Sequence, residues 1–169
     1  MQRVLFVVAA LAAVAIHLIW WVTYAGIHYI PRYTVRPPGA AAEAQRTSVR
    51  LLSLTRADQL VNAEQDRPGI PDPGTVWMVA EFEAVRHDPA QDFYCDLRLM
   101  GPQQRLWSEA PPVGRTTPGC RSDDLVVGQP GRFESIFSVP IRYADQLVGM
   151  ALPDDSTAAR TPVLTPPQT

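Results

Sequence analysis

The sequence predicts a mainly β protein, an antiparallel β-sandwich preceded by one transmembrane helix. Three observations indicate this fold class. One continuous apolar stretch lies near the N-terminus, short runs in the middle of the chain alternate apolar and polar residues, and Pro, at 17 of 169 residues, separates those runs. Alternation with a period of two is typical of strands that bury one face. Frequent Pro disfavours a helical bundle, because Pro cannot continue a helix.

The apolar N-terminal stretch predicts a membrane anchor in residues 1–30. From Val4 to Val22 every residue is apolar except His17, which makes 19 positions. A helix of that length spans about 28 Å, close to the hydrocarbon core of a bilayer at about 30 Å. Aromatic rings with a polar edge favour the interface between membrane and water. The residues that we expect at this interface are Trp20, Trp21, Tyr24 and Tyr29.

A cleaved signal peptide is the alternative to an anchor. Thr23-Tyr24-Ala25 before Gly26 would suit a signal peptidase. We favour the uncleaved anchor, because the apolar stretch is longer than the roughly 7–15 residues of a signal sequence.

The orientation of the anchor rests on two opposing signals. Arg3 favours a cytoplasmic N-terminus, whereas Arg32, Arg36 and Arg46 on the other flank favour the reverse. We expect the N-terminus inside and the soluble part outside the cytoplasm, because an oxidising compartment suits the two cysteines described below. We expect His17 to be a neutral side chain, either in contact with a neighbouring helix or without a particular role, rather than a proton relay, since a relay needs several polar groups.

The rest of the chain is predicted to form three further parts. Residues 31–46 are rich in Pro and Ala and read as a stalk. Residues 153–169 contain four Pro and no aromatic residue, which predicts a disordered tail. Between them, residues 47–152 have the size of one β-sandwich domain.

Alternation predicts the strands of this domain. In the clearest case, Phe93, Cys95, Leu97 and Leu99 alternate with residues that favour the solvent-exposed face of a strand. A short helix is predicted at residues 56–65, where apolar residues recur at helical spacing. The predicted strands cover residues 48–54, 75–84, 92–100, 105–108, 132–139 and 146–152.

Cys95 and Cys120 are the only cysteines, and we predict that they form a disulfide. Closing a loop of about 25 residues stabilises a domain by roughly 3 kcal/mol in the chain-entropy model. A zinc or redox site is the weaker interpretation, because the two residues have no CxxC spacing and no nearby His.

Three segments resemble a known family. They are WMVAEFEA (77–84), DFYCDLRLMGPQQRLW (92–107) and GQPGRFESIFSVP (128–140). Following an anchor, they are similar to bacterial extracytoplasmic immunoglobulin-like domains of the immunoprotective-antigen type, a family largely of unknown function. The resemblance implies an immunoglobulin-like sandwich with a binding or structural role and no particular reaction. The Cys…Trp…Cys order of antibody domains is absent, because Trp77 precedes both cysteines.

Composition and motifs argue against several function classes. The net charge is -2 and all 15 basic residues are Arg, so we expect no nucleic-acid surface. His87 is the one candidate base, but Arg86-His87-Asp88-Pro89 reads as a turn and no GxSxG motif supplies a nucleophile. Asp123-Asp124 lacks the spacing of a calcium loop. We therefore predict neither catalytic nor metal nor cofactor-binding residues.

These observations predict a cell-membrane protein with a structural or protein-interaction role in the cell envelope, accessory to a membrane complex. Its expected partners are the lipid bilayer and an envelope or membrane protein. A domain that binds a small ligand or lipid is the alternative, and it would need an apolar cavity of at least about 300 Å³. A hydrolase using His87 with Asp88 or Asp92 is the third reading.

Overall fold

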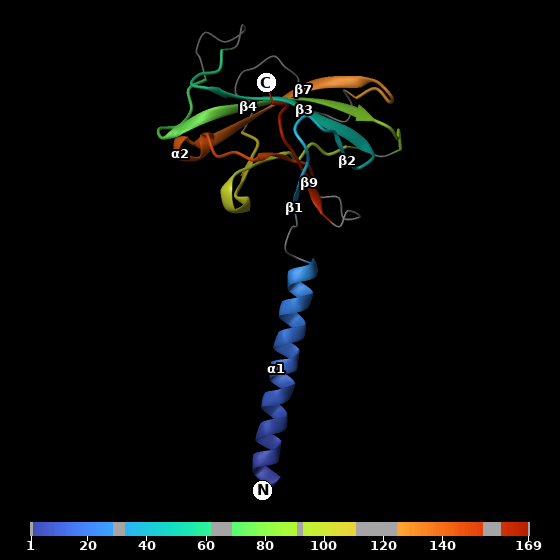
Figure 1. Ribbon diagram of the computed structural model, residues 1–169, viewed down its shortest axis with the longest axis vertical. Coiled ribbons are helices and arrows are strands. Elements are labelled where there is room, and N and C mark those ends of the chain that lie inside the picture. The colour runs from blue at the N-terminus through green and yellow to red at the C-terminus, as the bar shows by residue number, and fades with distance from the viewer. Residues whose placement is uncertain are drawn as a thin grey trace. The chain divides into compact units, whose positions relative to one another are not determined.

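The computed structural model describes residues 2–28, 33–61, 69–90, 93–110, 125–153 and 160–168. The chain divides into two compact units, Met1–Arg32 and Tyr33–Thr169. The first unit contains one long helix and the second contains two β-sheets (Figure 1).

The helix α1 (Gln2–His28) confirms the predicted apolar helix. Its segment Phe6–Tyr24, 19 residues long, is apolar and long enough to cross a bilayer, and none of it is buried against the rest of the chain. The run is rich in β-branched residues, which are poor helix formers in water, but a helix satisfies every backbone polar group within its own segment. The side-chain hydroxyl of Thr23 also has its hydrogen-bond partner within the helix, since it donates to the carbonyl oxygen of Ile19 at 2.9 Å.

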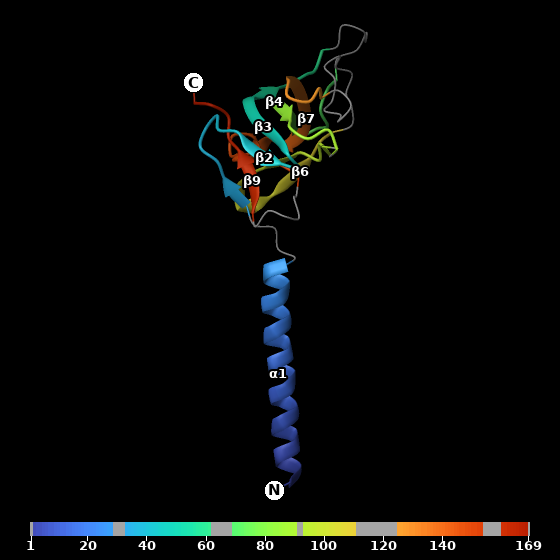
Figure 2. The same cartoon turned by 90° about the vertical axis from the view of Figure 1, so that its right-hand side faces the viewer.

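The second unit is a two-layer sandwich (Figures 1 and 2). One sheet has the order β2-β3-β4-β7, and the other has the order β1-β9-β8-β5-β6. A 3-10 turn, η1 (Pro102–Gln104), joins β5 to β6, and the short helix α2 (Ile141–Ala144) follows β7. The strands are β1 (Tyr33–Val35), β2 (Ala42–Ala44), β3 (Thr47–Ala57), β4 (Thr75–Arg86), β5 (Arg98–Met100), β6 (Leu106–Ser108), β7 (Pro130–Pro140), β8 (Gly149–Ala151) and β9 (Thr161–Leu164).

The strand order is immunoglobulin-like. In that fold, strands A, B and E are neighbours in one sheet and strands C, F and G in the other. Here β3-β4-β7 occupy the first set of places and β5-β8-β9 the second, with β6 beside β5 as C′ lies beside C. The predicted β-sandwich is therefore confirmed. One pairing differs from the antiparallel expectation: β1 and β9 run in the same direction and form a parallel pair.

The core between the sheets follows the predicted alternation. On β4 the residues Val76, Met78, Ala80 and Phe82 all point inward and are buried. The ring of Phe82 packs against that of Phe133 on β7, with 5.7 Å between ring centres. The largest fully buried side chains are Phe82, Phe93, Phe137, Leu51, Leu60, Leu97, Leu99, Met150, Leu164, Val49, Val139 and Val163.

Two predicted strands are shorter than expected. Within the predicted range 92–100, of which residues 93–100 are described, the strand is Arg98–Met100, because the Asp96 N–H donates to the Tyr94 carbonyl oxygen at 2.9 Å and turns the backbone. In residues 146–152 the strand is Gly149–Ala151, because the Gln146 N–H still bonds the end of α2.

The predicted helix at 56–65 is wrong for its described part. Arg56 and Ala57 continue β3, since they pair with Met78 and Trp77 on β4. Further on, Leu60 forms an isolated bridge with Gly69. Residues 62–65 lie outside the described residues.

The predicted stalk (31–46) and disordered tail (153–169) are also wrong where they are described. β1 and β2 lie within the supposed stalk. Thr161–Leu164 is a strand in which all four residues are buried, and it lies between β1 and β8. Val163 and Leu164 carry enough apolar surface to be buried in the core, although the segment is short, Pro-rich and free of aromatics. The sandwich domain therefore includes both ends of the soluble part.

We expect Leu164→Ala to destabilise the protein by about 2–5 kcal/mol, because it removes a fully buried side chain and leaves a cavity. Chemical denaturation monitored by circular dichroism measures this difference. Ile70→Ala is the matched control, since Ile70 is 74% exposed and should change stability little. An unchanged midpoint for Leu164→Ala would mean that the C-terminal segment is not part of the core.

Candidate functional site

The four-stranded sheet presents an outer face with two different halves. At one end Trp77, Val79 and Ile136 form an apolar cluster that Leu60 covers. The Trp77 indole N–H donates to the Gly69 carbonyl oxygen at 3.0 Å, which holds the β3–β4 connection against this half. The other half carries charged side chains of β3, β4 and β7, and we call it the charged half. Its residues are Arg50, Glu81, Glu83, Arg132 and Glu134.

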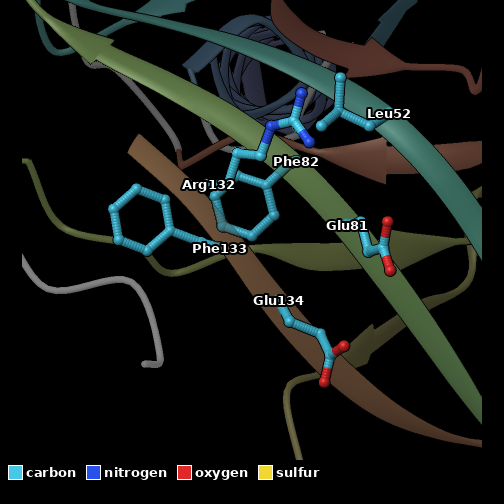
Figure 3. Close-up of a pocket in the computed structure, with 6 residues that line it drawn as sticks. All are labelled: Leu52, Glu81, Phe82, Arg132, Phe133 and Glu134. Carbon is cyan, nitrogen blue, oxygen red and sulfur yellow. The ribbon is translucent and has the colours of Figure 1, made fainter. Parts of the chain in front are cut away.

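A shallow hollow of about 260 Å³ lies in the charged half (Figure 3). Its lining residues are Leu52, Glu81, Phe82, Arg132, Phe133 and Glu134. A β-bulge between Leu51 and Ser53 places the extra residue Leu52 at its edge. Figure 3 shows the Arg132 guanidinium beside Leu52, while the carboxylates of Glu81 and Glu134 extend away from the phenylalanine rings.

The cross-strand pairs in this half include one pair of like charges and one pair of opposite charges. Glu81 lies directly opposite Glu134, and Glu83 lies opposite Arg132. Arg50 donates to Glu83 at 3.0 Å from the other side. Like charges directly opposite each other weaken a strand pair, so the Glu81–Glu134 pair does not contribute to the stability of the sheet.

The hollow does not suit a small-ligand carrier. Its volume is below the roughly 300–1,000 Å³ of typical ligand pockets, and three of its six lining residues are charged. Its shape and charge suit contact with a polar surface.

Of the candidate hydrolase residues, the structure describes His87 and Asp88. His87 is exposed in the turn after β4, and its backbone N–H donates to the Arg46 carbonyl oxygen at 3.1 Å. The Asp88 carboxylate binds Arg46 at 3.1 Å and accepts from the Ala90 N–H at 2.9 Å, which stabilises the turn. Asp92 and Asp123-Asp124 lie outside the described residues. Within the described ranges no group of three His, Cys, Asp or Glu side chains could hold a metal ion.

Cys95 is partly buried against the core and is not a free thiol. Cys120 lies outside the described residues, so the Cys95–Cys120 pairing stays a prediction.

Three of the four predicted interface aromatics are described, and they lie near the end of α1. The rings of Trp20 and Tyr24 stack one turn apart, with 5.6 Å between their centres. The Trp20 ring also lies 6.4 Å from the His17 ring. Trp21 is exposed on the same helix, and Tyr29 lies outside the described residues.

Glu109, after β6, is the one described carboxylate whose pKa is shifted, although much of the residue is exposed to solvent. Desolvation raises the pKa of Glu109 above its usual value of 4.5, and the Ser135 side chain partly opposes this shift. Sequence reasoning did not single out this residue, because its partner lies on another strand.

No known family model and no curated protein matches the sequence. Among solved structures, a conserved hypothetical protein from Bacillus anthracis is similar at 11% identity and a TM-score of 0.48, over 73% of this chain and 92% of that chain. An uncharacterized β-sandwich protein from Clostridium difficile 630 is similar at 8% identity and a TM-score of 0.49, over 80% of this chain and 95% of that chain. At these levels the similarities say nothing about function, and the assignment of the fold rests on the strand order itself.

We expect Glu109→Gln to raise the melting temperature slightly near neutral pH. Because the pKa of Glu109 is higher in the folded state, ionising this group opposes folding above that pKa. The cost disappears below the pKa of the unfolded state. Melting curves of the variant and the wild type should therefore converge as the pH falls below 4.5. A difference that is constant with pH would contradict this account.

Reduction of the predicted disulfide should lower the free energy of unfolding by roughly 3 kcal/mol, because the unfolded chain regains the entropy of a closed loop. Urea denaturation with and without dithiothreitol measures the change. A Cys95→Ala/Cys120→Ala variant is the control and should not respond to the reductant. An identical midpoint for the wild type under both conditions would disprove the pairing.

Proposed function

We propose that this chain is a single-pass membrane protein whose β-sandwich lies outside the cytoplasm and binds an envelope or membrane protein. The observation that carries the proposal is the apolar segment Phe6–Tyr24, which is 0% buried within the chain. An apolar surface of this size is unfavourable in water. A bilayer covers it, and the length of the segment matches the hydrocarbon thickness.

The ends of the helix support an anchor with its N-terminus inside. Trp20, Trp21 and Tyr24 lie at the end that leads into the sandwich, as expected where a span meets the headgroups. Arg3 lies at the other end and favours the cytoplasmic side. The state of Cys95, which is not a free thiol, supports an oxidising compartment for the sandwich.

The charged half of the outer face is the surface that we assign to protein recognition. Exposed Glu81 and Arg132 surround a shallow hollow with Leu52 and two phenylalanine rings below. Polar groups around a small apolar centre are typical of transient protein interfaces. A binding role as an accessory of a membrane complex fits the binding or structural role that the immunoprotective-antigen resemblance implies, and the immunoglobulin-like strand order is compatible with that resemblance.

The anchor is tested by fractionating cells that express the full-length chain. The protein should stay in the membrane pellet after carbonate extraction, because only disruption of the bilayer releases a spanning helix. A chain without residues 1–28 should move to the soluble fraction. Recovery of a shortened chain in the medium would instead show that the segment is a cleaved signal peptide.

The interaction surface is tested by photo-crosslinking in whole cells. A photoreactive residue at position 81 should crosslink to one membrane or envelope protein, and Arg132→Glu should weaken this crosslink. The control carries the photoreactive residue at position 36, which is exposed and follows β1 in the other sheet. Equal crosslinking at both positions would contradict the assignment of the surface.

A further inference from the structure

A second cluster of charged and aromatic side chains lies between the β5–β6 turn and α2. Arg105 precedes β6, while Arg142 and Tyr143 belong to α2. Each guanidinium carbon lies 4.8 Å from the centre of the Tyr143 ring. Arg105 also donates through Nη1 to the Tyr143 hydroxyl at 2.8 Å. We call these three residues the Arg–Tyr cluster. In Figure 1 the β5–β6 turn and α2 lie on the same side of the sandwich.

The two arginines of the cluster share one ring and no carboxylate. Both guanidinium groups stack on the Tyr143 ring, and each guanidinium carbon lies 4.8 Å from the ring centre. The two carbons therefore cannot be farther apart than twice that distance. Among the described residues neither forms an ion pair. Within the described part of the chain, four other arginines do pair with an Asp or Glu. These paired arginines are Arg46, Arg50, Arg56 and Arg98.

Two positive charges at this separation repel each other, and a shared anion removes the repulsion. A guanidinium stacked on a ring keeps its N–H edges available for further hydrogen bonds. Those edges match the oxygens of phosphate, and the bonds are charge-assisted on both sides. Stacking also restricts the side chains before a ligand arrives, so less conformational entropy is lost on binding.

The backbone of the turn holds this arrangement in place. A Cβ atom at Gly101 would lie 2.6 Å from the Trp107 ring, so only glycine lets the indole pack on the turn. Trp107 in turn supports Tyr143, with 5.7 Å between ring centres. Gln103 and Gln104 adopt φ values of 57° and 58°, an unfavourable conformation for residues other than glycine. Such conformations concentrate at binding and active sites.

We propose that Arg105, Arg142 and Tyr143 bind the phosphoryl group of an anionic ligand, with each guanidinium donating to a different phosphate oxygen. A tetrahedral phosphate offers enough oxygens to bridge both arginines. The phosphoryl group comes either from a lipid headgroup or from a soluble phosphate ester. The site is separate from the charged half of the outer face and does not depend on that assignment.

The test uses the full-length protein, labelled with ¹⁵N-arginine, in micelles of a maltoside detergent that contains no phosphate. On titration with inorganic phosphate, the Nε–H signals of Arg105 and Arg142 should shift with saturation. Arg105→Gln/Arg142→Gln should weaken phosphate binding by at least about tenfold, since it removes two charge-assisted contacts. Nanodiscs with phosphatidylglycerol should give the same shifts without added phosphate if the source is a lipid headgroup, and no such shifts if it is a soluble ester.

The matched control is Arg36→Gln/Arg160→Gln, which removes the same charge from two exposed positions. It should leave binding unchanged, and melting curves should show both double variants folded. Arg142→Lys keeps the charge but loses the planar fork, so it should also weaken binding. Shifts that do not saturate, or an equal loss in both double variants, would overturn the proposal, because either result shows general electrostatic attraction.

Discussion

The structure depends on the insertion of β9 between β1 and β8. This pairing joins the last strand of the chain to the first, and it buries Val163 and Leu164 completely. The fit is close, since a Cβ atom at Gly149 would collide with the Leu164 carbonyl group. Only a glycine at that position allows β8 and β9 to pair as they do.

The same insertion determines how the chain is organised. Because β1 begins at Tyr33 and α1 ends at His28, only residues 29–32 separate the helix from the sandwich. Much of what reads as a flexible spacer in the sequence is therefore part of the domain.

The long elements were predictable from the sequence, whereas the short strands in the supposed stalk and tail were not. β4 and β7 alternate over eleven or twelve residues, so their periodicity is visible and their inward faces were identified correctly. The strands β1, β2 and β9 have only three or four residues each. Alternation cannot be recognised over so few positions, and Pro162 made β9 resemble a loop. Their burial comes from pairing with distant segments.

The same limit applies to the candidate sites. The aromatic residues of α1 were predictable because they are close together in the sequence and follow an apolar run. The contact between Arg105 and Tyr143 joins residues 38 positions apart, and the facing pair Glu81 and Glu134 depends on the register of β4 and β7. Composition and spacing contain no information about such pairs, so only the folded chain identifies them.

Hydrogen–deuterium exchange of the full-length protein in nanodiscs measures the central claim most directly. If the C-terminal segment is an inner strand, the backbone amides of Val163 and Leu164 should exchange as slowly as those in the middle of β4, since all of them open only when the sandwich unfolds. Exchange of these two amides within seconds, while β4 stays protected, would show that the segment is a tail and that the domain closes in another way.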